Sequence, residues 1–512
     1  MNACFVRPLG GRGRACAPSA LRNWVARLFN VDIRKAKAHV YRLQMRIAKA
    51  ARQKRYNKVG ALQWLLSHSF YAKLLGVHRV MSNKGHKTSG IDGVLWTNDE
   101  DKANAVRHLK RRGYQSQPLR RILIPKSNGK KRPLGIPTLH DRAMQAVYHL
   151  GLDPVAEVWA DLNSYGFRQK RSCQDALQKA FTVLARKSSA RWVLDADIKG
   201  CFDHIDHEWM LQNIPMDRQM LATWLKCGYI DNSVFHQTNE GTPQGGIISA
   251  TLCNMVLDGL EQQVHQAVPR QGSRVNFIRY ADDFVITATN KELLTEKILP
   301  VVKAFLEPRG LTLSEEKTHI TTIDQGFDFL GCRVRKYSNT LLITPKRSKV
   351  YAFARQIREL IRKGVALPTH DLLRQLNRKL RGWFHYYRAV VSKRTFAFID
   401  FIVYKALSRW MNRRHPTRGK HWLHRRYFLS QQTPTNSYRQ IFYARCARAD
   451  GTTQQITLFK LSDLSIRRHV KIRSQAIPYD PAYRKYFQKR WCQQRLKRDT
   501  DKERLAKYQL VF

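Results

Sequence analysis

Residues 275–286 read VNFIRYADDFVI, and this stretch decides the fold. Two short apolar runs, 275–278 and 284–286, flank Tyr280-Ala281-Asp282-Asp283 and predict two strands joined by a tight turn. Two adjacent carboxylates repel each other, and one tends to keep its proton unless a cation neutralises the pair. Magnesium removes that penalty and uses the carboxylates to hold phosphate oxygens. The stretch therefore indicates a hairpin that binds a divalent metal and, through it, a phosphate group.

The composition indicates a polyanionic partner. The 512 residues contain 92 Lys and Arg against 38 Asp and Glu, a formal net charge of +54. Such a charge opposes compaction unless a partner screens it, and each neutralised phosphate of a nucleic acid releases counterions. With 43% hydrophobic residues the chain can build packed cores, and its length suggests roughly three domains. A merely soluble basic protein is the plain alternative.

Cysteine usage and hydropathy argue against secreted, zinc-ribbon and membrane-spanning classes. The nine cysteines are scattered without a C-x-x-C pair, which fits a reducing interior. No run of eighteen or more apolar residues exists, so we expect no membrane span. Residues 1–33 form a basic arm that resembles a transit peptide only weakly. We therefore expect a bacterial cytoplasmic protein, associated with the nucleoid when on its target, rather than an organellar one.

Periodicity predicts many helices, with strands near the acidic residues. Two helices are expected within 34–81, and Pro243-Gln244-Gly245-Gly246 is expected to open a helix that runs to about Val268. Further helices are expected to end near Arg112 and to span 139–159, 172–187, 291–309, 349–363, 370–391 and 394–412. Strands are expected at 120–125, 132–136 and 192–198 and near 318–334.

A second acidic strand end completes the expected metal site. Residues 192–198 predict a buried strand that contains Asp197. A polymerase needs two metals about 4 Å apart that share a carboxylate and clamp the attacking and leaving oxygens of an in-line displacement. Asp197 from one strand, with Asp282 and Asp283 from a neighbouring hairpin, would supply that bridge. YADD alone is also typical of an ordinary acidic turn, but the apolar strands and the intervening GTPQGG favour the metal site.

Further motifs follow in a fixed order along the chain. They are SGIDG at 89–93, IPK and RPLGIP within 124–137, DIKGCF at 197–202, GTPQGG at 241–246, YADD at 280–283, FDFLG at 327–331, LRGWFHYY at 380–387, and HVKI and PYDP within 469–481. As an ordered series covering roughly residues 35–490, they resemble the reverse transcriptases encoded by group II introns.

That resemblance implies an α+β fold, a right-hand polymerase whose palm has an antiparallel sheet, followed by a helical thumb and maturase (X) domain and a basic C-terminal DNA-binding region. The implied parts are a basic N-terminal arm at 1–33, an N-terminal extension with fingers at 34–190, the palm at 191–345, the thumb and maturase domain at 346–412, and the DNA-binding region at 413–512. Many relatives continue into an HNH endonuclease with paired Cys and His. Residues 492–512 hold one Cys and no His, so we expect no endonuclease and priming from another DNA end.

The resemblance also implies roles for the acidic residues and one lysine. Asp197, Asp282 and Asp283 become the catalytic residues that bind two Mg²⁺ ions, with Mn²⁺ as a substitute and the carbonyl of Ile198 as an extra ligand. Lys317 resembles the lysine that protonates the pyrophosphate leaving group. A surface lysine beside two glutamates is its plain alternative.

Nucleotide, template and primer contacts are implied in the same way. Lys126 and Arg132 flank the fingers hairpin and would reach the β- and γ-phosphates of a triphosphate, or form only a solvated turn. Phe202 resembles a steric gate against a ribonucleotide 2′-hydroxyl, or packs in the core. Gln244 resembles the residue that orients the nascent base pair. The implied template loop is Ser89, Gly90, Ile91, Asp92 and Gly93, and the implied primer grip includes Phe329, Leu330 and Gly331.

The sequence thus predicts an RNA-directed DNA polymerase that binds its group II intron RNA as a ribonucleoprotein, promotes splicing, and copies the RNA by target-primed synthesis. Its expected partners are intron RNA, target DNA with a primer, and deoxynucleoside triphosphates, without a membrane. A basic patch is expected to contact phosphates, and it comprises Arg381, Arg413, Arg414, Arg418, Lys420, Arg425 and Arg426. Two other hypotheses stay open: a splicing cofactor without active polymerase, and a domesticated reverse transcriptase in DNA repair or in antiviral or CRISPR defence.

Overall fold

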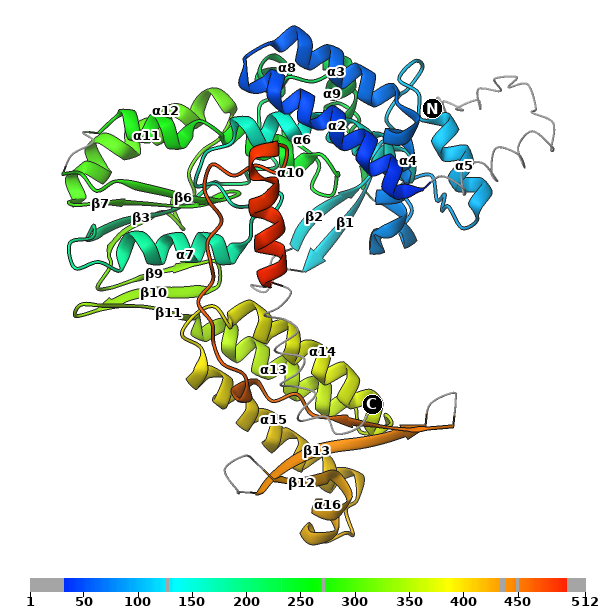
Figure 1. The fold of residues 1–512 in the computed structure, drawn as a ribbon, viewed down its shortest axis with the longest axis vertical. Helices are drawn as coiled ribbons and strands as arrows, with labels where there is room; N and C mark the ends of the chain where they lie inside the picture. Colours follow the sequence, from blue (N-terminus) through cyan, green and yellow to red (C-terminus); the bar gives the residue numbers. More distant parts are fainter. Residues whose placement is uncertain are drawn as a thin grey trace. The chain divides into compact units, whose positions relative to one another are not determined.

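The computed structural model describes residues 32–125, 129, 131–231, 233–268, 272–432, 438–447 and 451–494 (Figure 1). The chain forms two compact units: unit 1 is Met1–Trp159 with Gly200–Val256, and unit 2 is Ala160–Lys199 with Leu257–Phe512. Most of the expected basic arm lies outside the described residues, as does the chain from residue 495. The expected palm, residues 191–345, is divided between the two units, and the five-part division stays a prediction.

Helices dominate unit 1. The long helix α6 (Leu139–Trp159) contacts α2 (Ile33–Arg52), α3 (Tyr56–His68) and α4 (Phe70–Ser82). The prediction of two helices within 34–81 is wrong, because the chain leaves the helical conformation twice and makes three. Unit 1 also contains α5 (Asp99–His108), α8 (His207–Asn213), α9 (Arg218–Leu225), α10 (Ser249–Leu257) and the short 3₁₀ helix η1 (Lys84–Lys87).

A small mixed sheet completes unit 1. Its strand order is β2-β1-β4-β5, with β1 (Leu119–Pro125) antiparallel to β2 (Lys131–Ile136) and parallel to β4 (Tyr229–Asp231). The edge strand β5 (Val234–His236) pairs with β4 in the antiparallel sense. The predicted strands at 120–125 and 132–136 are confirmed, and most of the turn between them lies outside the described residues.

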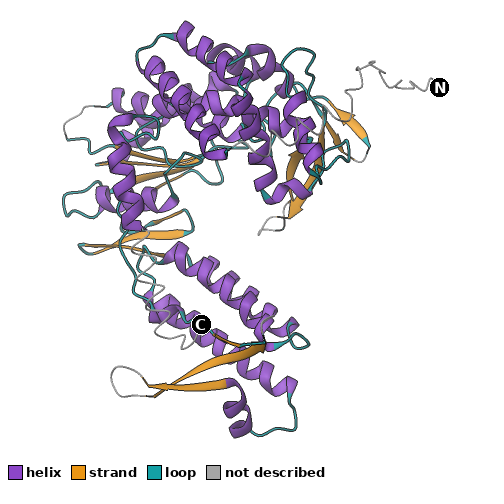
Figure 2. Ribbon diagram, turned by 45° about the vertical axis from the view of Figure 1, so that its right-hand side comes forward, coloured by secondary structure: helices purple, strands orange, loops and turns teal. Residues whose placement is uncertain are grey.

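Unit 2 is built on an antiparallel sheet with the order β6-β7-β3-β8. Its strands are β6 (Asn276–Tyr280), β7 (Asp283–Ala288), β3 (Trp192–Asp197) and β8 (His319–Thr322). Helix α7 (Cys173–Leu184) contacts both β6 and β11 and so lies between this sheet and a second one, with the order β11-β10-β9 (Figures 1 and 2). That second sheet consists of β9 (Phe327–Phe329), β10 (Cys332–Tyr337) and β11 (Thr340–Pro345).

The helix expected from residue 243 to about Val268 is wrong. Pro243–Gly246 lies in a loop, α10 begins at Ser249, and α11 (Leu260–Gln266) follows only after Gly259. Gly259 has φ +98, a left-handed conformation that breaks a right-handed helix. The helix expected at 291–309 is also divided, into a π-helical turn at Leu293–Ile298, α12 (Leu299–Leu306) and a 3₁₀ turn at Glu307–Arg309.

The remainder of unit 2 is a helical bundle that carries a third sheet. The predicted helices after residue 347 are confirmed as α13 (Arg347–Lys363), α14 (Thr369–Tyr387) and α15 (Lys393–Arg414). No elements were predicted after residue 412, where the structure has α16 (Lys420–Tyr427) and a sheet of β12 (Phe428–Gln432), β13 (Tyr438–Ala447) and β14 (Thr453–Thr457). Among the described residues, every helix is too short or too polar to cross a membrane.

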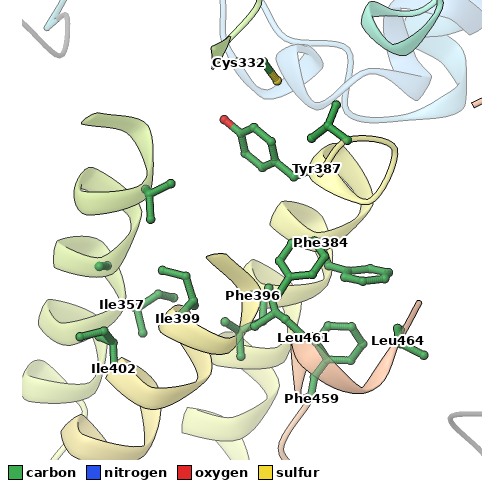
Figure 3. Packing of buried hydrophobic residues seen from close by; sticks show 14 of the residues in the cluster. Cys332, Ile357, Phe384, Tyr387, Phe396, Ile399, Ile402, Phe459, Leu461 and Leu464 are labelled. Carbon is green, nitrogen blue, oxygen red and sulfur yellow. The ribbon is translucent and has the colours of Figure 1, made fainter. Parts of the chain in front are cut away.

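The apolar core of this bundle joins elements distant in sequence (Figure 3). The ring of Phe384 on α14 lies 5.1 Å from that of Phe396 on α15 and 5.8 Å from that of Phe459, measured between centroids. All three rings are buried. Burial of a large apolar side chain contributes roughly 1.5–3 kcal/mol, so the chain after β14 is held firmly against the helices.

Candidate active site

The hairpin of β6 and β7 presents Asp282 and Asp283 at a two-residue turn. Tyr280 and Asp283 are register partners, which leaves Ala281 and Asp282 as the turn. Ala281 has φ +59, a conformation that costs energy for a residue with a Cβ atom. Gly166 lies directly against this turn, because a Cβ atom there would come within 2.9 Å of the carbonyl carbon of Tyr280. The turn is therefore held in a strained shape by close backbone packing.

The neighbouring strand β3 brings Asp197 to the same end of the sheet. Asp197 and Asp283 are register partners across the antiparallel β3–β7 pair. The backbone N–H of Ile198 donates to the carbonyl oxygen of Asp282 at 3.4 Å, which ties the end of β3 to the turn. The structure therefore brings together the three aspartates expected to bind metal, with Ile198 beside them.

Lys317 joins this acidic group, and Asp195 is a member that was not predicted. The Nζ atom of Lys317 donates to Oδ2 of Asp197 at 2.5 Å, and this hydrogen bond raises the lysine pKa. Burial, with the charges of Asp195, Asp197 and Asp282, raises the pKa of Asp283 to about 8. Burial, then the nearby Asp328 and Asp197, raises the pKa of Asp195 to about 7. The LDAD motif at 194–197 was the signal that could have revealed Asp195.

The chemistry of this group fits Mg²⁺. Carboxylate oxygens are the ligands that magnesium prefers. Burial and then three neighbouring carboxylates raise the pKa of Asp283, and a divalent cation would stabilise its ionised form. In the described part of the chain, no three His, Cys, Asp or Glu side chains already converge as a metal cluster, and Lys317 takes up one oxygen of Asp197. Metal binding would therefore require these aspartates to close around the ion.

Unit 1 brings together three residues of the expected nucleotide site. Nε of Arg132 donates to Oε1 of Gln244 at 2.5 Å, and Nε2 of Gln244 donates to Oδ1 of Asp203 at 3.1 Å. The carbonyl of Phe202 accepts from the N–H of Thr242 at 2.7 Å. Phe202, Asp203 and Gln244 line one cavity of about 590 Å³. Asp203 was not predicted as part of this site. Because its carboxylate accepts from Nε2 of Gln244, it sets the orientation of the Gln244 amide. Lys126 lies outside the described residues.

The expected template loop packs against the start of α6. The guanidinium of Arg142 donates to the carbonyl oxygens of Gly85 at 2.9 Å and Thr88 at 2.7 Å, just before Ser89–Gly93. Within the loop, the carboxylate of Asp92 accepts from the N–H of Val94 at 3.3 Å. Side-chain hydrogen bonds thus hold the approach to the loop and one of its turns.

The expected primer grip, Phe329 to Gly331, comprises the last residue of β9 and the turn that follows this strand. Phe329 is buried, so its ring belongs to the core. The hydroxyl of Tyr386 donates to the carbonyl of Leu330 at 2.8 Å, and that of Tyr387 to the carbonyl of Gly331 at 3.2 Å. Two tyrosines of α14 therefore fix the Leu330–Gly331 turn, which is the partly exposed part of this segment.

The expected basic patch divides into exposed and structural residues. Arg414 is structural, because its guanidinium donates to the carbonyls of Val365 and Leu367 and lies over the ring of Trp410. The members with exposed side chains are Arg381, Arg413, Arg418, Lys420, Arg425 and Arg426. Exposed cations are the ones available for phosphate contacts.

Known protein families match this chain in three segments. The family "Reverse transcriptase (RNA-dependent DNA polymerase)" matches residues 124–334, the "N-terminal domain of reverse transcriptase" matches 29–109, and the "Group II intron, maturase-specific domain" matches 350–428. These matches define a polymerase of the reverse transcriptase class that carries a maturase-specific domain.

Individual relatives agree with that class. The group II intron-encoded protein LtrA of Lactococcus lactis is 29% identical over 409 residues, which are 65% of this chain and 66% of LtrA. Protein YkfC of Escherichia coli is 32% identical over 329 residues, which are 55% of this chain and 86% of YkfC. A telomerase structure from Candida albicans aligns with 59% of this chain at 13% identity and a TM-score of 0.34, too low to support a conclusion. The chain belongs to the family of group II intron-encoded reverse transcriptases, and it spans just under two thirds of the length of LtrA.

Proposed function

We propose that this protein is an RNA-directed DNA polymerase that binds its group II intron RNA, promotes the splicing of that RNA, and copies it into DNA during target-primed mobility. The observation that carries the proposal is the register pairing of Asp197 with Asp283, with Asp282 at the adjoining turn. Two Mg²⁺ ions, when bound, would supply the charge that activates a primer 3′-hydroxyl and neutralises the leaving pyrophosphate.

The residues around the aspartates have separate tasks in this proposal. Asp197, Asp282 and Asp283 hold the metal ions, with the carbonyl of Ile198 as an additional ligand. Lys317 carries the proton that the pyrophosphate takes as it leaves, and its ion pair with Asp197 holds it beside the acids.

The residues of unit 1 select and orient the incoming nucleotide. Arg132, assisted by Lys126, binds the β- and γ-phosphates, whose negative charge grows in the transition state. Gln244 presents its amide to the nascent base pair in the orientation set by Asp203 and Arg132. The ring of Phe202 excludes a 2′-hydroxyl by steric clash, which favours deoxynucleotides over ribonucleotides.

The nucleic-acid partners are intron RNA, target DNA and a DNA primer, and the working form is a ribonucleoprotein. The turn at Leu330–Gly331 holds the primer end, and Ser89–Gly93 holds the template. The exposed arginines and lysines of α16 and its approach contact phosphates of the RNA or DNA.

The test is the isosteric substitution Asp282→Asn, assayed for DNA synthesis on a primed RNA template and for binding of structured intron RNA. Loss of one charge at the metal site should lower synthesis by at least about 10²-fold and leave RNA affinity within about twofold. Asp324→Asn, which removes an exposed carboxylate elsewhere in unit 2, is the matched control and should keep both activities. Synthesis at the wild-type rate by Asp282→Asn would refute the assignment of the site.

A further inference from the structure

A cavity of about 370 Å³ lies between α15 and the sheet of β12 and β13, apart from the aspartates. Both views show α15 beside this sheet (Figures 1 and 2). Helix α15 lines the cavity with Phe401, Tyr404 and Leu407, and the sheet lines it with Phe428 and Phe442. Its volume lies in the range of about 300–1,000 Å³ that is typical of sites for small ligands.

Two aromatic rings at this cavity are left open to solvent. The side chain of Phe401 is 51% exposed and that of Tyr404 is 50% exposed, although both belong to a helix whose other face is buried. The centroids of the Tyr404 and Phe428 rings are 6.3 Å apart, with planes tilted by 59°. Exposed rings at the mouth of an apolar cavity favour a flat, aromatic ligand that covers them.

The polar groups of the lining also favour a nucleobase. The carboxylate of Asp400 is already used, because it accepts from the backbone N–H groups of Leu461 at 2.9 Å and Ser462 at 2.8 Å. Gln440, Lys460 and Ser462 complete the polar side of the lining, and the side chains of Gln440 and Lys460 are exposed. A glutamine amide both donates and accepts, which suits the edge of a base.

Positive charge lies in the cavity lining at Lys460 and near it on α15. The ammonium of Lys405 lies 4.6 Å from the centroid of the Phe401 ring. Arg409 follows one helical turn later on α15 and is also exposed. Together with Lys460, these cations suit the phosphates on either side of a bound base. Much of the wall lies within the residues 350–428 that match the maturase-specific domain.

We propose that this cavity binds one unpaired base of single-stranded RNA. The base stacks on Tyr404 with Phe401 beside it, Gln440 contacts its edge, and Lys405 and Lys460 hold the neighbouring phosphates. The inference rests on the proposed function only in that RNA is the partner of this domain. Single-stranded RNA is favoured over duplex because a paired base cannot leave its stack without an energetic cost.

The first test measures binding of the full-length protein to a single-stranded RNA oligonucleotide by filter binding. Stacking on an aromatic side chain contributes roughly 1–3 kcal/mol per base, so Tyr404→Ala should weaken affinity by about tenfold, while Tyr404→Phe should retain it. The matched control is Tyr351→Ala, which removes an equally exposed ring (56%) on α13 away from the cavity and should leave affinity unchanged. Because Tyr404 is half exposed, its truncation should preserve the fold, which a thermal melt would verify.

The second test uses RNA that carries 4-thiouridine at single positions, cross-linked by light and mapped by mass spectrometry. We expect cross-links to the peptide that contains Phe401 and Tyr404, and weaker ones from a single-stranded DNA with 4-thiothymidine. Equal affinities of wild type, Tyr404→Ala and Tyr351→Ala would overturn the cavity assignment while leaving the proposed function intact. Preferential cross-linking of DNA would overturn the choice of RNA, and wild-type protein that binds no RNA would overturn the proposed function itself.

Discussion

Replacing Gly166 with alanine should damage DNA synthesis although Gly166 carries no chemistry of its own. Its new methyl group would lie 2.9 Å from the carbonyl carbon of Tyr280, against 3.4 Å or more in ordinary contact, and closer still to the backbone nitrogen of Ala281. Both neighbours are backbone atoms and cannot rotate away. The turn that carries Asp282 and Asp283 must therefore move by several tenths of an ångström. A misplacement of 1 Å can cost about 10²-fold in rate, so we expect a loss of about tenfold or more.

The assay is primer extension on an RNA template with saturating nucleotide, read as kcat, with RNA affinity and a thermal melt measured in parallel. The control is Gly60→Ala. Gly60 lies in α3, and apart from its chain neighbours and the backbone of its own helix no atom lies within 4 Å of the position that a methyl group would take. Alanine also favours helix by about 1 kcal/mol relative to glycine. Gly60→Ala should keep its activity and melt no lower than wild type. A Gly166→Ala protein with wild-type kcat and an unchanged melt would show that the close approach to the turn does not position the aspartates.

Three further predictions concern nucleotide binding, charge and pH. Asp203→Ala should raise the KM for deoxynucleotides by about tenfold with a smaller change in kcat, because it removes one of the two hydrogen bonds that orient the amide of Gln244; an unchanged KM in steady-state extension would contradict this. RNA affinity should fall steeply with salt, by roughly 0.7–0.9 logarithmic units per phosphate contact for each tenfold rise in salt, and a flat response in filter binding would refute the electrostatic argument. Burial, then the nearby Arg79, lowers the pKa of His149 to about 3, so between pH 3 and 6.5 the unfolded chain binds a proton that the folded chain does not. The free energy of unfolding should therefore fall as pH drops through that window, and denaturant titrations of His149→Gln should show a shallower fall.

The strands around the aspartates were predictable because each strand is a short apolar run of consecutive residues. The sequence VNFIRYADDFVI contains both strands of a hairpin and its turn, and the stretch before Asp197 is equally apolar. The convergence of Asp197 with the hairpin of Asp282 and Asp283 was an inference from the chemistry that a polymerase needs, whereas the register that pairs Asp197 with Asp283 was not predicted. A slip of one residue in that register would have turned one of the carboxylates to the opposite face.

Contacts across long stretches of chain were not predictable. A single sequence does not reveal that β3 packs between β7 and β8, or that Asp328 lies near enough to Asp195 to raise its pKa. The sheet after residue 427 was not predicted, because polar and basic residues interrupt the apolar pattern of its strands, as in TQQIT at β14. Phe329 was expected at the primer end and is buried, since strand periodicity does not tell which face a three-residue strand turns to the core.

Unit 2 contains a second acidic cluster, which pairs with a buried arginine and can be compared with the candidate metal site. Asp161 and Asp258 lie beside Arg279, which is completely buried and forms ion pairs with both. Burial raises the pKa of Asp161 to about 7 even though the charge of Arg279 lowers it, so the buried arginine only partly offsets the cost of these carboxylates.

The cation beside Asp197 is of a different kind. It is Lys317, whose side chain is 64% exposed and which can swing away on a flexible stem. Burial and the charges of neighbouring carboxylates raise the pKa of Asp195 to about 7 and that of Asp283 to about 8. Such a cluster destabilises the folded chain at neutral pH until cations from solution bind it. The two clusters differ in their cation: a buried arginine pairs with the carboxylates of one, whereas an exposed lysine leaves those of the other accessible to metal ions. That difference favours an active polymerase over a binding protein that only retains the fold.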